Sequence, residues 1–257
     1  MASKSENSDS VSLGVGNIVG ESFSILFGNL IAVIPLVLVP VLLSIVIASS
    51  MVGADVALGV EAPDFSTFSN IAIWALMFVV QIVFYALATA LLVQLTYDAK
   101  LGRPLQPGRY ISPALRSAIL IAVLTIISSV LVGLASIALI IPGLWVYAVF
   151  SMIVPAVLFE GAWFRGLRRS AMLTKGYRWP ICGVLLLIGV CAGIVSFLAS
   201  VVASFLVDTG DWAMIAAFSA IAVFAVGLAG ISIALIYARL REIKEDVSVD
   251  KIVSVFD

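Results

Sequence analysis

The residues best suited to chemistry form a cluster of cations flanked by aromatic side chains. The cations are Arg165, Arg168, Arg169, Lys175 and Arg178, and the flanking tryptophans are Trp163 and Trp179. Arg165, Arg168 and Arg169 share one helical face by their i, i+3, i+4 spacing, and guanidinium groups can hold phosphates bidentately. The pattern predicts a short helix over residues 163–175 that lies at a membrane surface and binds anionic lipid headgroups or a partner protein. The alternative is that these cations only orient the chain and extend toward water.

Glu160 directly precedes this cluster. We expect it to form an ion pair with Arg165 or Arg169 at the membrane interface. The chain has no histidine, and it contains no Cys-x-x-Cys, phosphate-binding loop or nucleophile–base pattern. The sequence therefore predicts no enzymatic activity, no cofactor and no metal site. An enzyme acting on lipid headgroups is a third hypothesis, for which Glu160 alone is too little.

The composition indicates the solvent in which these residues are positioned. Hydrophobic residues make up 63% of the 257 residues, charged residues make up 11%, and the net charge is −1. Soluble domains contain about 25% charged residues, so this chain folds mainly in lipid, and its net charge argues against nucleic-acid binding. Five uncharged stretches are long enough to cross the roughly 30 Å of hydrocarbon in a bilayer. They are residues 30–53, 71–97, 117–159, 179–207 and 212–238.

The third stretch is about twice as long as one crossing requires. Ile141-Pro142-Gly143 near its middle is a turn signal, so we interpret the stretch as two helices. The second of these, residues 144–159, is short, and we expect Pro155 to bend it. Six crossings place all 14 Lys and Arg residues on one side of the membrane. By the positive-inside rule, that side and both termini are cytoplasmic.

Similar segments precede the first, third and fifth crossings, at residues 15–26, 114–120 and 166–173. Each predicts a short amphipathic helix at the cytoplasmic interface, although similar composition alone would also explain the likeness. The predicted fold is an all-α polytopic membrane protein with six transmembrane helices, arranged as three hairpins with short cytoplasmic interfacial helices. We expect a single domain over residues 11–245, between a disordered cytoplasmic tail (residues 1–10) and a cytoplasmic C-terminal tail (residues 246–257).

No Asp, Glu, Lys or Arg lies in the middle of a crossing, and the main polar residues there are Gln81, Tyr85, Ser128 and Ser129. Hydrogen bonds between helices would explain them. The alternative function is a transporter or flippase for a small amphiphilic solute, and a water-accessible cavity near the midplane, lined by Gln81, Tyr85 or Ser128, would favour it.

Small residues recur in the last two crossings. The spacing predicts close helix packing, within the bundle or in a homo-oligomer. The residues are Gly189, Gly193, Ala216 and Ala220, with Gly227 and Gly230 nearby.

Several short motifs resemble one bacterial membrane-protein family. They are Gly20-Glu21-Ser22-Phe23, Ile141-Pro142-Gly143, Pro155, Glu160-Gly161, Leu167-Arg168-Arg169-Ser170 and Leu173-Thr174-Lys175-Gly176. The chain is similar to the membrane domain found fused to some glycerophosphoryl diester phosphodiesterases and also found as stand-alone proteins. In the fused enzymes a separate soluble domain with His and acidic residues carries the chemistry, and this chain contains no such domain. The resemblance implies only the membrane module of a bacterial inner-membrane protein. The expected partners, anionic lipids or a membrane or cytoplasmic protein, follow instead from the cluster of cations.

Overall fold

A computed structural model describes residues 12–53, 56, 64–205 and 211–246. The helices are α1 (Val15–Gly28), α2 (Leu30–Val52), α4 (Phe68–Lys100), α5 (Pro107–Ala138), α6 (Ile140–Phe150), α7 (Ile153–Glu160), a 3₁₀ turn η1 (Trp163–Arg165), α8 (Gly166–Thr174), α9 (Arg178–Phe205) and α10 (Asp211–Glu245). Six segments are long and apolar enough to span a membrane: α2, α4, α5, α6 together with α7, α9, and α10. This confirms the all-α polytopic fold, and the chain is a multi-pass membrane protein. The predicted tails lie outside the described residues, except for Asp246.

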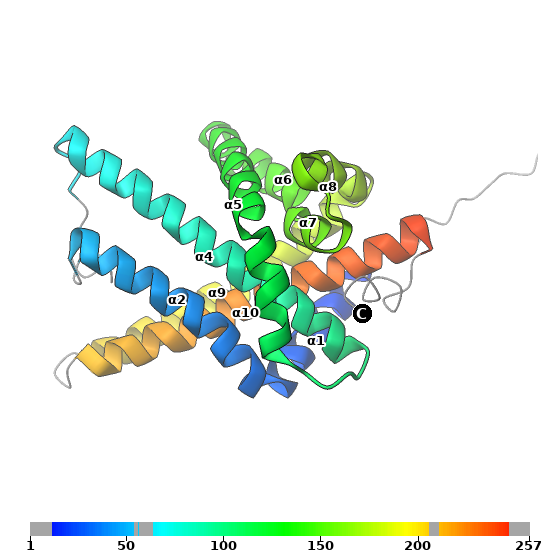
Figure 1. Ribbon diagram of the computed structural model, residues 1–257, viewed down its shortest axis with the longest axis horizontal. Coiled ribbons are helices and arrows are strands. Elements are labelled where there is room, and N and C mark those ends of the chain that lie inside the picture. Colours follow the sequence, from blue (N-terminus) through cyan, green and yellow to red (C-terminus); the bar gives the residue numbers. More distant parts are fainter. Residues whose placement is uncertain (1–11, 54–55, 57–63, 206–210, 247–257) are drawn as a thin grey trace, which may run out of the picture.

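The helices form three hairpins that separate from one another toward one end of the bundle. Figure 1 shows α2 with α4, α5 with α6, and α9 with α10 ending far apart there. At least half of the apolar window is buried in α4, in α6–α7 and in α10, but less than a third in α2, α5 and α9. The three more buried segments therefore form the centre of the bundle, and the other three present mostly apolar side chains to lipid.

The hairpins converge at the opposite end, which we call the basic face because Lys100, Arg169, Arg178 and Arg239 lie there. Its packing is aromatic: the Tyr97 ring meets Phe159 edge-on with centroids 4.7 Å apart, and Phe159 stacks on Tyr237. The Tyr97 hydroxyl also donates a hydrogen bond to the Ala234 carbonyl oxygen at 3.2 Å. These contacts join α4, α7 and α10, which are far apart in sequence.

The turn between α5 and α6 lies slightly before the predicted position. Leu139 is extended (φ −167°, ψ 152°) and separates the two helices, whereas Ile141, Pro142 and Gly143 form the first turn of α6. Proline is tolerated there because the first turn has no internal hydrogen bond to lose. A Cβ atom on Gly143 would overlap the Ser136 side chain, so glycine permits this close reversal.

The fourth crossing, which we expected to bend at Pro155, is broken into two helices before that residue. α6 ends at Phe150 and α7 begins at Ile153, so Pro155 occupies the first turn of α7. Ser170 of α8 forms hydrogen bonds to the backbone on both sides of the break. Its hydroxyl donates to the Val149 carbonyl oxygen at 2.6 Å and accepts from the Met152 N–H at 3.2 Å. The serine thus replaces backbone hydrogen bonds that the broken helix lacks.

Two of the three predicted interfacial helices are separate elements. α1 precedes α2, and α8 precedes α9, with Gly176 in the left-handed region (φ +88°) between α8 and α9. The prediction is wrong for residues 114–120, which belong to the continuous helix α5. Pro113 removes one backbone hydrogen bond there without ending the helix. The predicted helix over residues 163–175 is also divided, into η1 and α8.

Candidate functional site at the basic face

The candidate site begins at the turn after α7. Glu160 is the last residue of that helix, and Gly161 follows in the left-handed conformation (φ 57°, ψ 34°). Glycine adopts this conformation without a steric penalty, so the chain can reverse into η1 and α8. A Cβ atom on Gly166 would come within 2.9 Å of Leu124 and 3.1 Å of Val157. α8 therefore lies close against α5 and α7, with Ser170, Leu173 and Thr174 on its buried side.

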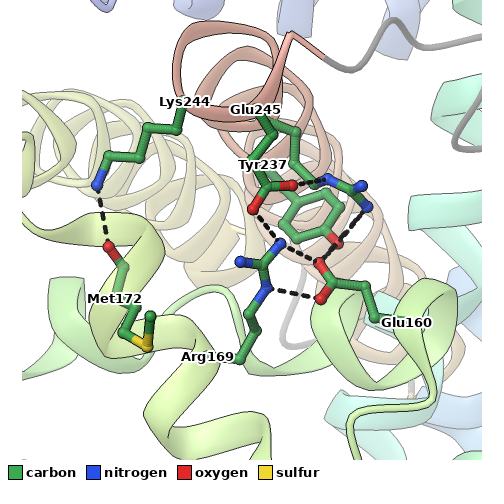
Figure 2. A network of polar contacts seen from close by, with 7 residues as sticks. Glu160, Arg169, Met172, Tyr237, Lys244 and Glu245 are labelled. Atoms are coloured by element: carbon green, nitrogen blue, oxygen red, sulfur yellow. Dashed lines mark hydrogen bonds and ion pairs between the residues drawn. The ribbon is translucent and has the colours of Figure 1, made fainter.

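Glu160 lies at the centre of an ion-pair network between α7, α8 and α10, which Figure 2 shows from close by. Arg169 donates to the Glu160 carboxylate from Nε at 2.6 Å and from Nη2 at 2.9 Å. Nη2 of Arg169 also lies 2.5 Å from Glu245. Arg241 pairs with Glu245 at 2.8 Å and lies 3.5 Å from Glu160. The Tyr237 hydroxyl donates to Glu160.

The network neutralises its own charges, because two carboxylates face two guanidinium groups. Burial lowers the pKa of Arg169, but the hydrogen bonds and charges of Glu160 and Glu245 outweigh that effect and raise the pKa above its usual value. The predicted pair between Glu160 and Arg169 is confirmed. Arg169 is therefore turned into the protein, away from the face that the i, i+3, i+4 spacing suggested. Sequence reasoning missed Tyr237, Arg241 and Glu245 because they lie on another helix.

Arg165 and Arg168 differ from Arg169 in being exposed. Neither has a hydrogen bond or ion pair within the part of the chain that the structure describes. Arg165 lines a hollow of about 570 Å³ together with Glu160, Ala162, Phe164 and Arg169. Phe164 is 70% exposed beside it. An anionic group entering this hollow would meet the unpaired charge of Arg165.

The remaining predicted residues of the cluster have different surroundings. Lys175 is exposed, and its backbone carbonyl accepts from Nζ of Lys244 at 2.6 Å. Arg178 is half-buried, with its guanidinium 4.5 Å from the centre of the Trp145 ring. Trp179 is 66% exposed, and the Trp163 side chain lies outside the described part of the structure. Arg178 thus contributes to packing on α6, whereas Lys175 and Trp179 face outward.

The polar residues within the crossings line a cavity of about 520 Å³ between α4, α5 and α6–α7. Gln81, Tyr85 and Ser128 are all part of its wall. The lining matches the one that the transport hypothesis predicts, and access of water to the cavity stays a prediction. Ser129 and Tyr147 line it too.

The small residues of α9 do not pack inside the chain. Gly189 and Gly193 are exposed, and an added Cβ atom on either would meet nothing within 4 Å. Ala220 is exposed, and the Ala216 side chain lies outside the described part. Close packing falls instead on Gly230, where a Cβ atom would lie 2.6 Å from Leu92 Cδ1, and on Gly227, which contacts Leu26 and Val33. For Gly189 and Gly193, contact between protomers stays a prediction.

Within the described residues, no three Cys, Asp or Glu side chains are grouped closely enough to hold a metal ion. The candidate site is thus a neutral ion-pair network with two exposed arginines, Arg165 and Arg168, of which Arg165 lines a surface hollow. The resemblance of the chain to the membrane domain of glycerophosphoryl diester phosphodiesterases stays a prediction. Comparison of the chain with protein-family models, curated proteins and solved structures found no match.

Proposed function

We propose that this protein is a non-catalytic inner-membrane protein that binds anionic lipid headgroups on its basic face, which is cytoplasmic. The orientation follows from the positive-inside rule. The observation that carries the proposal is that Arg165 and Arg168 are exposed and without partners in the described chain, and that Arg165 lines the hollow at Phe164. A phosphate there would receive charge-assisted hydrogen bonds.

The ion-pair network supports this proposal by holding the site in place. Glu160 and Arg169 connect the turn after α7 to α8, and Glu245 connects α8 to α10. Arg165 and Arg168 are therefore presented from a region whose backbone is restrained on both sides. A restrained site loses less conformational entropy when a ligand binds.

The test compares the double variant Arg165→Gln/Arg168→Gln with a charge-matched control, Arg116→Gln/Arg239→Gln. Protein in phosphatidylcholine nanodiscs containing dioleoylphosphatidylglycerol is analysed by native mass spectrometry for retained lipid. A charge-assisted hydrogen bond from a positioned arginine to the phosphate contributes about 1.5 kcal/mol, so losing two weakens binding roughly 100-fold. The control retains wild-type binding of the anionic lipid. Equal retention by both variants would refute headgroup binding at this site and leave the two arginines to a protein partner or to topology.

Transport of a small amphiphilic solute is a second candidate, favoured by the cavity at Gln81, Tyr85 and Ser128. Transporters place their binding sites near the bilayer midplane, and the cavity lies between helices at that level. Proteoliposomes containing a fluorescent phospholipid test it: external dithionite should bleach the inner-leaflet label faster than in protein-free vesicles. Equal bleaching rates would remove lipid transport as a function.

A further inference from the structure

The cavity between α4, α5 and α6–α7 has unpaired polar groups at the depth of the lipid hydrocarbon. Gln81 lies about 20 Å along α4 from Phe68, and still further from Lys100 at the other end. Ser129 lies about 14 Å from the end of α5 at Ala138. Both positions are far from the helix ends, so the groups that line this cavity lie at the depth of the hydrocarbon.

Some of the lining hydroxyls already donate to their own helices. Thr89 donates to the Tyr85 carbonyl at 2.9 Å, Ser128 donates to Thr125 at 2.8 Å, and Ser151 donates to Ala148 at 2.9 Å. Their oxygen atoms remain available only as acceptors. The wall of the cavity therefore offers several acceptors whose own protons are already in use.

The Gln81 amide and the Ser129 hydroxyl differ from these groups, because neither has a hydrogen bond within the described residues. An unsatisfied polar group in hydrocarbon costs several kcal/mol. A molecule with its own hydrogen-bonding groups would remove that cost at both residues. The two side chains come from different helices, α4 and α5, so one bound molecule can contact both.

The chemistry of the lining excludes a charged group. No Asp, Glu, Lys or Arg is among the residues that line the cavity, and a charge without a counter-ion at this depth is strongly unfavourable. The rest of the wall is apolar, with Ile82, Phe150 and Ile153 among its members. The site thus suits an uncharged molecule that combines hydroxyl or ester groups with a hydrocarbon body.

The mouth of the cavity faces lipid. Phe78 is 58% exposed, and Gln81 and Gly133 are exposed too, although all three line the cavity. Since these residues lie at hydrocarbon depth, a ligand enters sideways from the bilayer. The volume of the cavity, about 520 Å³, is within the range of roughly 300–1,000 Å³ for small-molecule sites.

We propose that this cavity binds one uncharged lipid bearing hydroxyl or ester groups, which enters from the bilayer past Gly133 and hydrogen-bonds to Gln81 and Ser129. This binding depends neither on headgroup binding at Arg165 and Arg168 nor on transport. It supplies the ligand class that transport through this cavity would require.

Dioleoylglycerol is the probe, because it carries a free hydroxyl and two ester groups without charge. The full chain in phosphatidylcholine nanodiscs doped with dioleoylglycerol is released for native mass spectrometry, and bound lipid is counted. Parallel samples contain squalene, which has no polar group, or dioleoylphosphatidylglycerol. We expect wild-type protein to retain one dioleoylglycerol, and Arg165→Gln/Arg168→Gln to retain it equally. Squalene should not replace dioleoylglycerol, and the charged lipid should not compete with it.

Two variants place the ligand in the cavity. Gly133→Leu fills the mouth at a position where an added Cβ atom meets nothing within 4 Å, so it should block entry and abolish retention. Gly189→Leu, at an equally open glycine on α9, is its control and retains the lipid. Gln81→Leu keeps the cavity open but removes the amide, and weakens retention about tenfold. Wild-type retention in both Gly133→Leu and Gln81→Leu, no retention by wild-type protein, or equal retention of squalene would overturn the proposal.

Discussion

Replacing Glu160 with Gln should destabilise the protein far more than a comparable change at a surface ion pair. Glu160 accepts two hydrogen bonds from Arg169 and one from Tyr237, and the variant leaves two guanidinium groups sharing one carboxylate. Breaking a buried ion pair costs about 3–5 kcal/mol, whereas exposed pairs contribute under about 1 kcal/mol. The side chains of Glu160, Arg169 and Arg241 are 21%, 23% and 16% exposed. Discounting the buried figure for this exposure gives an expected loss of about 2–3 kcal/mol.

The matched control is Glu21→Gln. Glu21 pairs with Lys100 at 2.8 Å, but the two side chains are 38% and 33% exposed, so its loss should cost under about 1 kcal/mol. Unfolding by SDS, followed by tryptophan fluorescence in mixed micelles, measures both variants against the wild type. The double variant Glu160→Gln/Arg169→Gln should lose less than the sum of the single losses, since the two residues interact directly. Equal losses for Glu160→Gln and Glu21→Gln would show that the network contributes no more than a surface pair.

Three further outcomes are expected. Ser170→Ala removes both hydrogen bonds to the break between α6 and α7, and should cost about 1–3 kcal/mol in the same SDS titration, while Ser112→Ala, at an exposed serine, should cost almost nothing. Gly230→Ala forces a methyl group against Leu92 and should cost about 1–3 kcal/mol, but Gly189→Ala should leave the unfolding midpoint unchanged. Alkaline phosphatase fused after Asp64 should be active because the positive-inside rule places that loop outside the cytoplasm, and an inactive fusion would reverse the proposed orientation.

Hydropathy and charge placement were enough to predict the number of crossings and which helix ends share a face. These properties depend only on the hydropathy and charge of consecutive residues. The helix starts agree with this: α2 begins at the predicted residue, Leu30, and α9 begins at Arg178, one residue before its predicted start. Pro155 likewise predicts the loss of one backbone hydrogen bond in its helix, because the missing N–H is a property of the residue itself. Local chemistry of this kind does not depend on which helices become neighbours.

Only the tertiary structure decided which cations are neutralised and which stay free. Arg168 and Arg169 are adjacent in the sequence, yet Arg169 faces Glu160 and Glu245 while Arg168 is exposed. The difference depends on the position of α10, which reaches α8 from some seventy residues later in the chain. The cavity at Gln81 depends in the same way on how α4, α5 and α6–α7 are arranged in space. Pairing energies and cavity shape are properties of distance in space, and the sequence specifies those distances only through the packing of the whole bundle.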